Sequence, residues 1–139
     1  NNKILHQSKL LNYFIKDLNN EKISKDANEI LKKIKSNKKY KFSRKDKILL
    51  DSLRYDGIDI QKKYDNLYEK DPNIPTDLQV LINNNNIGMI LLRLVEIIGE
   101  DQIENLGTET LYFITAVLNE TNLDNLRNKI IIKTLPNRV

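Results

Sequence analysis

The densest group of chemically active side chains in this sequence is a basic segment over residues 32–47, KKIKSNKKYKFSRKDK. It holds nine lysines or arginines, with a tyrosine and a phenylalanine among them. Basic side chains contact phosphates and aromatic rings stack on unpaired bases, so the segment could bind single-stranded nucleic acid or another anionic surface. The candidate contacts are Lys32, Lys33, Lys35, Lys38, Lys39, Tyr40, Lys41, Phe42, Arg44, Lys45 and Lys47. We favour the competing interpretation, a solvated linker, because lysine is abundant throughout the chain.

A second group of candidate residues is acidic and consists of Glu96, Glu100, Asp101 and Glu104. Glu96 and Glu100 are four residues apart, so on a helix they share one face, and Arg93 lies three residues before Glu96 and can pair with it. Two convergent carboxylates could transfer protons or hold a hard cation. We prefer the simpler interpretation, in which these side chains are the solvated acidic end of a helix.

The sequence offers little else for catalysis or cofactor binding. His6 is the single histidine and cysteine is absent, so neither a zinc site nor a haem site is expected. The four glycines are scattered and match neither phosphate-binding pattern, G-x-G-x-x-G or G-x-x-x-x-G-K-[ST]. We therefore expect no catalytic residue, no cofactor and no metal site.

The elements that must position these residues are helices, and the most apolar one is predicted over residues 87–99, IGMILLRLVEIIG. Its apolar residues recur at spacings of three and four, which is typical of a helix, and its length exceeds that of most strands. At 13 residues it is also too short for a membrane span, which needs about 20 residues. Asn85 or Asn86 can cap its start and Gly99 its end. Because it is apolar nearly all round, we predict that it lies buried in the middle of the core, where Gly88 permits close helix packing.

The same periodicity predicts helices over residues 3–19, 24–34, 43–57, 64–70, 76–82, 107–118 and 123–135. Capping boxes are predicted at Ser43 with Asp46 and at Thr76 with Gln79, and Gly57 is a helix end. The pair Asn19 and Asn20 is interpreted as a stop signal. No segment alternates like a convincing strand. The predicted fold is all-α, either a helical bundle or a short α-solenoid of antiparallel helical hairpins.

The patterns LLDSLRYDGIDI, IGMILLRLVEIIGED, TETLYFITAVLNE and LDNLRNKIIIKTLP extend over roughly residues 48–136. This region resembles the C-terminal region of uncharacterised alphaproteobacterial helical-repeat proteins. The helices that match are Met89–Gly99, Thr110–Leu118 and Leu123–Leu135. The resemblance implies a tetratricopeptide-like α-solenoid end without catalytic residues. The chain departs from the tetratricopeptide pattern in having no Trp and no W-x-x-L-G opening.

Charge divides the chain unevenly. Residues 1–56 carry 15 basic and 7 acidic side chains, whereas residues 57–139 carry 8 basic and 12 acidic side chains. We expect a basic helical N-terminal hairpin or arm over residues 1–41 and a helical core domain over residues 42–139, built around the buried helix 87–99. The chain begins with Asn, so we expect it to belong to a longer protein, and the resemblance implies a bacterial one. A chain without cysteine suits either redox environment, and we favour the cytoplasm.

The function expected from these observations is that of a non-enzymatic helical scaffold or protein-interaction module. Its partner would be another protein or the remainder of its own chain, and no membrane span is expected in this segment. The alternative is a nucleic-acid-associated helical protein that uses residues 32–47. An enzyme acting through the carboxylates between Glu96 and Glu104 is the third and least favoured hypothesis.

Overall fold

The computed structural model describes residues 10–14, 19–37, 39, 42–68 and 73–137, and over these residues it contains seven α-helices, four 3₁₀ turns and no strand. The all-α prediction is therefore confirmed. The helices are α2 (Asn20–Ser36), α3 (Arg44–Tyr55), α4 (Asp65–Tyr68), α5 (Thr76–Asn83), α6 (Ile87–Ile98), α7 (Thr108–Glu120) and α8 (Asp124–Thr134). The 3₁₀ turns are η1 (Asn12–Phe14), η2 (Lys62–Tyr64), η3 (Ile103–Asn105) and η4 (Leu135–Asn137).

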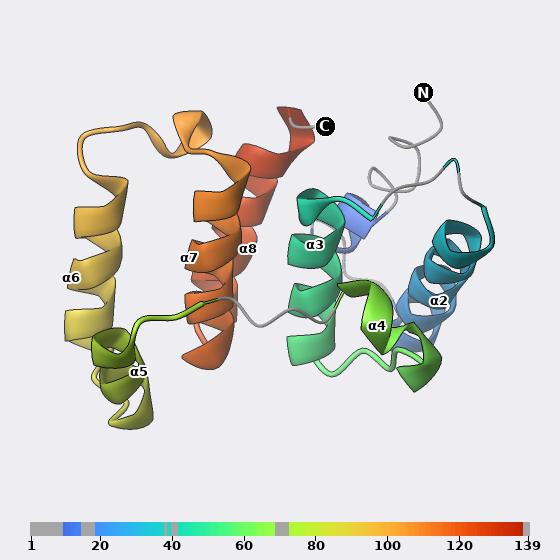
Figure 1. Ribbon diagram of the computed structural model, residues 1–139, viewed down its shortest axis with the longest axis horizontal. Helices are drawn as coiled ribbons and strands as arrows, with labels where there is room; N and C mark the ends of the chain where they lie inside the picture. Colours follow the sequence, from blue (N-terminus) through green and yellow to red (C-terminus); the bar gives the residue numbers. More distant parts are fainter. Residues whose placement is uncertain (1–9, 15–18, 38, 40–41, 69–72, 138–139) are drawn as a thin grey trace.

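The centre of the fold is the pair formed by α3 and α7, which make the most extensive contact between any two described helices. Figure 1 shows the helices standing side by side, from α6 at one end through α7 and α3 to α2 at the other. Leu49 and Leu50 of α3 and Val117 and Leu118 of α7 are completely buried. Helix α8 packs against α7 and completes this central group.

Helix α6 has the predicted bounds but not the predicted position. It runs from Ile87 to Ile98, and Gly99 follows with a positive φ of 64°. Only Ile90 and Leu94 are buried on this helix, and its principal neighbour is α5. The prediction of a central buried helix is therefore wrong. Apolar composition shows how much surface a helix is able to bury, but a helix at the end of a row has neighbours on one side only (Figure 1).

The capping predictions succeed for α3 and fail for α5 and for the start of α6, where Asn86 takes the N-cap position without a side-chain hydrogen bond. At α3 the Asp46 amide donates to Ser43 Oγ at 3.1 Å, and the Ser43 amide donates to Asp46 Oδ2 at 2.9 Å, which is a complete capping box. Gly57, with φ of 88°, ends the same helix as predicted. At α5 the N-cap position belongs to Pro75, so Thr76 is already inside the helix and no side chain caps it.

Helix α2 begins earlier than predicted, at Asn20. The Asn19 side chain accepts a hydrogen bond from the Glu21 amide at 2.7 Å, so the Asn pair predicted as a stop signal starts this helix. The buried face of α2 includes Ile23, Ala27, Ile30, Leu31 and Ile34. The predicted helix over residues 3–19 and His6 lie largely or wholly outside the described residues.

One hydrophobic cluster joins residues on both sides of the predicted domain boundary at residue 42. It contains Leu10 and Ile30 from the N-terminal part together with Leu49 and Leu118 from the centre. The division into an arm and a core stays a prediction. Among the described helices, none combines the length and the apolar character that crossing a membrane requires.

Candidate interaction surfaces

The basic segment 32–47 is divided between two helices and the connection between them. Lys32, Lys33 and Lys35 are exposed near the end of α2, and Lys39 is exposed in the connection. Lys38, Tyr40 and Lys41 lie outside the described residues, and Phe42 is partly buried against the core. The exposed lysines of α2 and Lys39 are therefore the described part of this segment that is open to a partner, and of these Lys35 Nζ also donates to the Lys63 carbonyl at 3.4 Å.

The basic residues at the start of α3 are built into the fold. Arg44 Nε donates to Glu109 Oε1 at 2.7 Å, and the guanidinium lies 4.8 Å from the centre of the Tyr112 ring, so this side chain ties α3 to α7. Lys45 and Lys47 are only 4% and 9% exposed. Burial lowers the pKa of the Lys45 ammonium, against the opposing effect of Asp46. The eleven candidate residues thus do not form one continuous surface in the described part of the chain.

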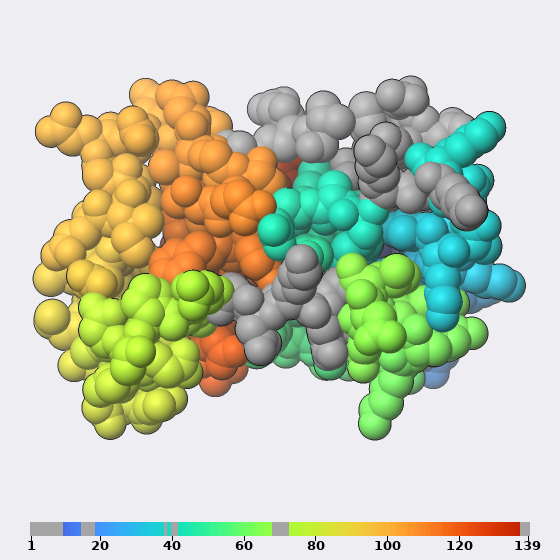
Figure 2. Space-filling view, in the orientation of Figure 1, coloured from blue at the N-terminus to red at the C-terminus, as the bar shows by residue number. Residues whose placement is uncertain are grey.

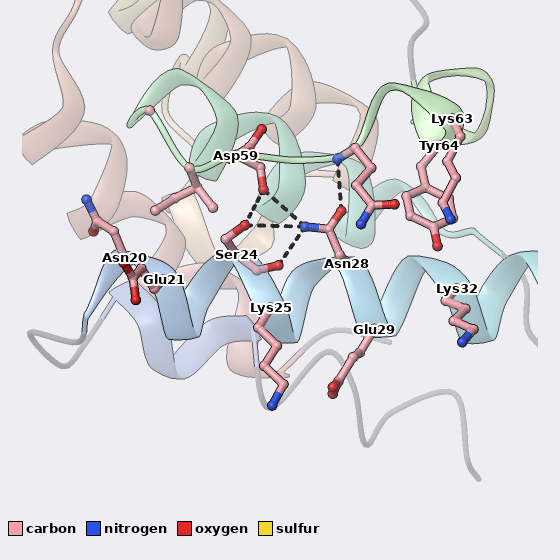
Figure 3. A pocket seen from close by; sticks show the side chains of 13 residues that line it. Asn20, Glu21, Ser24, Lys25, Asn28, Glu29, Lys32, Asp59, Lys63 and Tyr64 are labelled. Atoms are coloured by element: carbon pink, nitrogen blue, oxygen red, sulfur yellow. Dashed lines mark hydrogen bonds between the residues drawn. The ribbon is translucent and has the colours of Figure 1, made fainter.

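A hollow of about 630 Å³ lies between α2 and residues 57–64 (Figure 3). Ser24 Oγ donates to the Asp59 carbonyl at 2.5 Å, and Asn28 Nδ2 donates to the same oxygen at 3.1 Å. The Gln61 amide in turn donates to Asn28 Oδ1 at 2.9 Å. These polar groups hold the loop against α2. Charges of both signs, Lys25, Lys32, Lys63, Glu21, Glu29 and Asp59, line the hollow, so it favours neither an anion nor a cation.

The acidic candidates do not converge. Glu96 lies 3.9 Å from Arg93, and Glu104 Oε1 accepts a hydrogen bond from Lys133 Nζ at 3.1 Å. That hydrogen bond lowers the pKa of the Glu104 carboxyl. Glu100 and Asp101 are exposed. Within the described ranges, no three side chains of the types that bind metals gather at one point.

A buried arginine that sequence reasoning missed lies at the centre of the fold. Arg127 of α8 is 1% exposed. One terminal nitrogen donates to Asn119 Oδ1 of α7 at 2.9 Å and to the Ser52 carbonyl of α3 at 3.3 Å. The other donates to Asp56 Oδ2 at 2.7 Å. The guanidinium therefore links α3, α7 and α8, and its role is structural because its donors are already taken up by these groups.

A sequence signal for this arginine exists. Leu123, Arg127, Ile130 and Thr134 follow one another at spacings of four, three and four, so the arginine occupies a position on the apolar face of its helix. A charged residue on an apolar face means either that the face has been assigned wrongly or that the charged group is buried and paired. Helix-capping and apolar patterns alone do not distinguish these two cases.

Helix α6 carries an apolar surface that no described element covers, which we call the α6 outer face and define as Gly88, Met89, Leu92 and Val95. Met89, Leu92 and Val95 are 46%, 50% and 61% exposed. Gly88, Leu92 and Val95 are separated by four and three residues, so they lie along one line of the helix. A Cβ built at Gly88 would meet nothing within 4 Å, so the predicted role of this glycine in close packing inside the fold is wrong.

Comparison with known proteins gives no relative. No protein-family model, no curated protein and no solved structure matches this chain. The description that stands is that of an all-helical domain of packed helix pairs.

Proposed function

We propose that this chain is a non-enzymatic helical scaffold and protein-interaction module that binds its partner through the α6 outer face. The observation that carries the proposal is the exposure of Met89, Leu92 and Val95 along one side of a regular helix. Single exposed apolar side chains are ordinary, but a contiguous group on one helix marks an interaction site or an aggregation hazard. The partner is either another protein or a further part of the same polypeptide.

We propose further that this module is the end of a tetratricopeptide-like α-solenoid, and two consecutive helix pairs support this. The connections α5–α6 and α7–α8 each place an Asn in the left-handed region, Asn85 with φ of 54° and Asn122 with φ of 58°, at positions 37 residues apart. The same two backbone hydrogen bonds close both turns, from Asn86 to Leu81 and Asn85 to Ile82 in one, and from Leu123 to Leu118 and Asn122 to Asn119 in the other. This is a common kind of helix end, and α3 closes at Gly57 with the same two bonds. The support for an α-solenoid is therefore the succession of two helix pairs, each joined by a short turn. In such arrays a terminal repeat has one face without a neighbour, as α6 has here.

A photo-crosslinking experiment tests the proposal. A photoreactive amino acid is placed at Leu92 in the full chain, and the matched control places it at Ile132 of α8, which is also exposed but does not belong to the α6 outer face. We expect discrete crosslinked adducts from position 92 in lysate of the source organism and few from position 132. Equal crosslinking from both positions, or none from position 92, would contradict the proposal.

The nucleic-acid hypothesis is the second candidate, and the exposed Lys32, Lys33 and Lys35 on α2 are the observation that favours it. Titration of labelled single-stranded DNA and RNA over a range of salt concentrations tests it. We expect affinities of about 10⁻⁴ to 10⁻⁶ M that fall steeply with salt, as any basic surface gives. Submicromolar binding at physiological salt that is lost on changing these three lysines to alanine, or on Tyr40→Ala, would favour the second candidate over the first.

A further inference from the structure

We infer that the partner of the α6 outer face is an amphipathic helix whose apolar stripe is bordered by lysines or arginines. This inference rests on the proposed function and adds the chemistry of the partner. It depends on three features of α6 and its surroundings, which are the charge around the face, the acidic residues at the end of the helix, and the spacing of the apolar residues.

The region that carries the face is acidic, and most of its basic groups are already engaged. Residues 73–137 contain eight acidic and four basic side chains. Arg93 is held by Asp77 at 2.6 Å and lies 3.9 Å from Glu96, and Arg127 is buried against Asp56. Lys133 is paired with Glu104, and the exposed Lys129 lies beside Gln102 and Glu104. The region therefore keeps a net negative charge, and among its described basic side chains only Lys129 has no described ion pair. Electrostatic complementarity then selects a partner with positive charge.

The negative charge is concentrated at one end of α6. Glu100 and Asp101 follow directly after Gly99, the residue that ends the helix, and both are exposed. Within the described part of the chain, no ion pair engages either carboxylate. The C-terminus of a helix carries partial negative charge and favours cations. Two carboxylates at this end add to that charge, and a lysine or arginine of a bound partner would neutralise it.

The shape of the face suits a helix. Gly88, Leu92 and Val95 repeat at spacings of four and three, which is the seam spacing with which helices pack side by side. Gly88 has open space where a side chain would lie, so the backbone of a partner helix is able to approach the first turn of α6 closely. Packing of an amphipathic peptide helix, apolar face inward, against such a seam is one of the recurring modes of peptide recognition.

A second copy of the chain fits this surface less well. Two α6 outer faces packed in parallel would bring Glu96, Glu100 and Asp101 of one copy near the same residues of the other, and like charges at an interface are unfavourable. Packed antiparallel, these carboxylates would lie at the start of the other α6, where residues 83–92 offer no basic side chain. Helix α2, the basic amphipathic helix of the chain itself, already buries its apolar face through Ile23, Ile30 and Ile34. The partner is therefore a different segment with this chemistry.

Binding of designed peptides to the full chain tests the inference. Two peptides of about 20 residues, long enough to be helical, share one leucine seam and differ only in having Lys or Glu beside it. A third peptide keeps the lysines and replaces the leucines by serine. We expect the Lys–Leu peptide to bind about tenfold more tightly than the Glu–Leu peptide at low salt, the size that a few exposed ion pairs give together. The preference should shrink as salt is added.

Variants of the chain locate the binding surface. Leu92→Ser should weaken binding of the Lys–Leu peptide about tenfold, the loss of one apolar anchor, whereas Leu126→Ser, at an exposed residue of α8, should not change it. The double variant Glu100→Gln and Asp101→Asn should remove most of the preference for lysine. All of these side chains are exposed, and thermal melts would show that each variant folds.

Several outcomes would overturn the inference. Equal affinity for the Lys–Leu and Glu–Leu peptides would show that the partner's positive charge is not recognised. Equal binding of the Lys–Leu and Lys–Ser peptides would show that its apolar stripe is not recognised. A concentration-dependent dimer that Leu92→Ser abolishes would identify a second copy as the occupant. Absence of peptide binding, with crosslinking from position 92 intact, would refute the inference and leave the proposed function standing.

Discussion

Helices α6 and α7 have similar lengths, and α6 is the more apolar by composition, yet their surroundings are opposite. Helix α7 buries seven residues, two of which are the polar Thr115 and Asn119, whereas α6 buries two. Helix α7 packs against both α3 and α8, while α6 stands at one end of the molecule (Figure 2). The number of neighbouring helices, more than the apolar content of the helix itself, determines how much of it is buried.

The two regions also differ in how they use charge. In the centre, the guanidinium of Arg127 is buried and joins three helices through directed hydrogen bonds. At the end, Arg93 joins α5 to α6 through Asp77, with both side chains substantially exposed to solvent. Buried and exposed ion pairs differ greatly in what their loss costs, so the two arginines are a direct probe of the comparison.

The largest effect is expected from removing the buried arginine. Arg127→Ala removes a buried side chain and leaves the buried Asn119 and the partly exposed Asp56 without their donor. The lost packing and the unsatisfied Asn119 together should lower the free energy of unfolding by about 3 to 5 kcal/mol. Arg93→Ala, the matched change at the exposed pair, should cost about 0 to 1 kcal/mol. Urea denaturation of both variants measures the difference. Equal losses would mean that the end of the molecule is as tightly packed as its centre.

A pair of leucine substitutions compares packing without charge. Leu118→Ala removes a completely buried side chain from α7 and should cost about 2 to 5 kcal/mol. Leu92→Ala removes a half-exposed side chain from α6 and should change the stability by less than about 0.5 kcal/mol. Thermal or chemical melts of the two variants measure both losses of stability. A large loss for Leu92→Ala would show that the α6 outer face is covered in solution.

The helix caps give a smaller contrast. Ser43→Ala breaks the complete capping box of α3 and should cost about 1 kcal/mol, within a range of roughly 0.5 to 2 kcal/mol. Thr76→Ala should cost much less, because Thr76 lies inside α5 and no side chain caps that helix. Denaturant titrations of the two variants check this. A cost at Thr76 equal to that at Ser43 would indicate that Thr76 caps α5 after all.

The smallest effect concerns the hydrogen bond from Tyr55 to Glu120, which joins the last residue of α3 to the last residue of α7 at 2.5 Å. Partial burial of the hydroxyl and this hydrogen bond raise the pKa of Tyr55. Because the folded state holds the tyrosine proton more tightly than the unfolded state, this interaction stabilises the fold below the ordinary tyrosine pKa of about 10. The stabilisation is lost as pH rises above that value. Tyr55→Phe should therefore cost about 0.5 kcal/mol at neutral pH, the low end for a hydrogen bond because the side chain is exposed.

The pH dependence supplies the check on that variant. Unfolding measured from about pH 8 to about pH 11 should show a smaller alkaline loss of stability for Tyr55→Phe than for the unchanged chain. Identical pH profiles for the two proteins would show that the hydroxyl makes no lasting bond with Glu120.

Much of the fold could be predicted from local sequence, because the signals that start and stop helices act over a few residues. Ser43 with Asp46, Gly57 and Gly99 mark their helix ends correctly. The position of α6 could not be predicted, because periodicity shows which face of a helix is apolar but not whether another helix will lie against it. Of the candidate contacts, Lys45 and Lys47 proved to be buried because α3 lies in the centre, and that too depends on tertiary structure.

The central contact between α3 and α7 also has a consequence for the order in which the chain folds and opens. These helices are separated by the segment from Asp56 to Gly107, and α5 and α6 lie entirely within it. Bringing α3 and α7 together closes a long loop, which is a slow step, whereas α5 and α6 meet through a short local turn. We expect the α5–α6 pair to open without breaking the central contact. Amide hydrogens of α6 should then exchange with solvent through local opening, and those of α3 and α7 only when the whole domain unfolds.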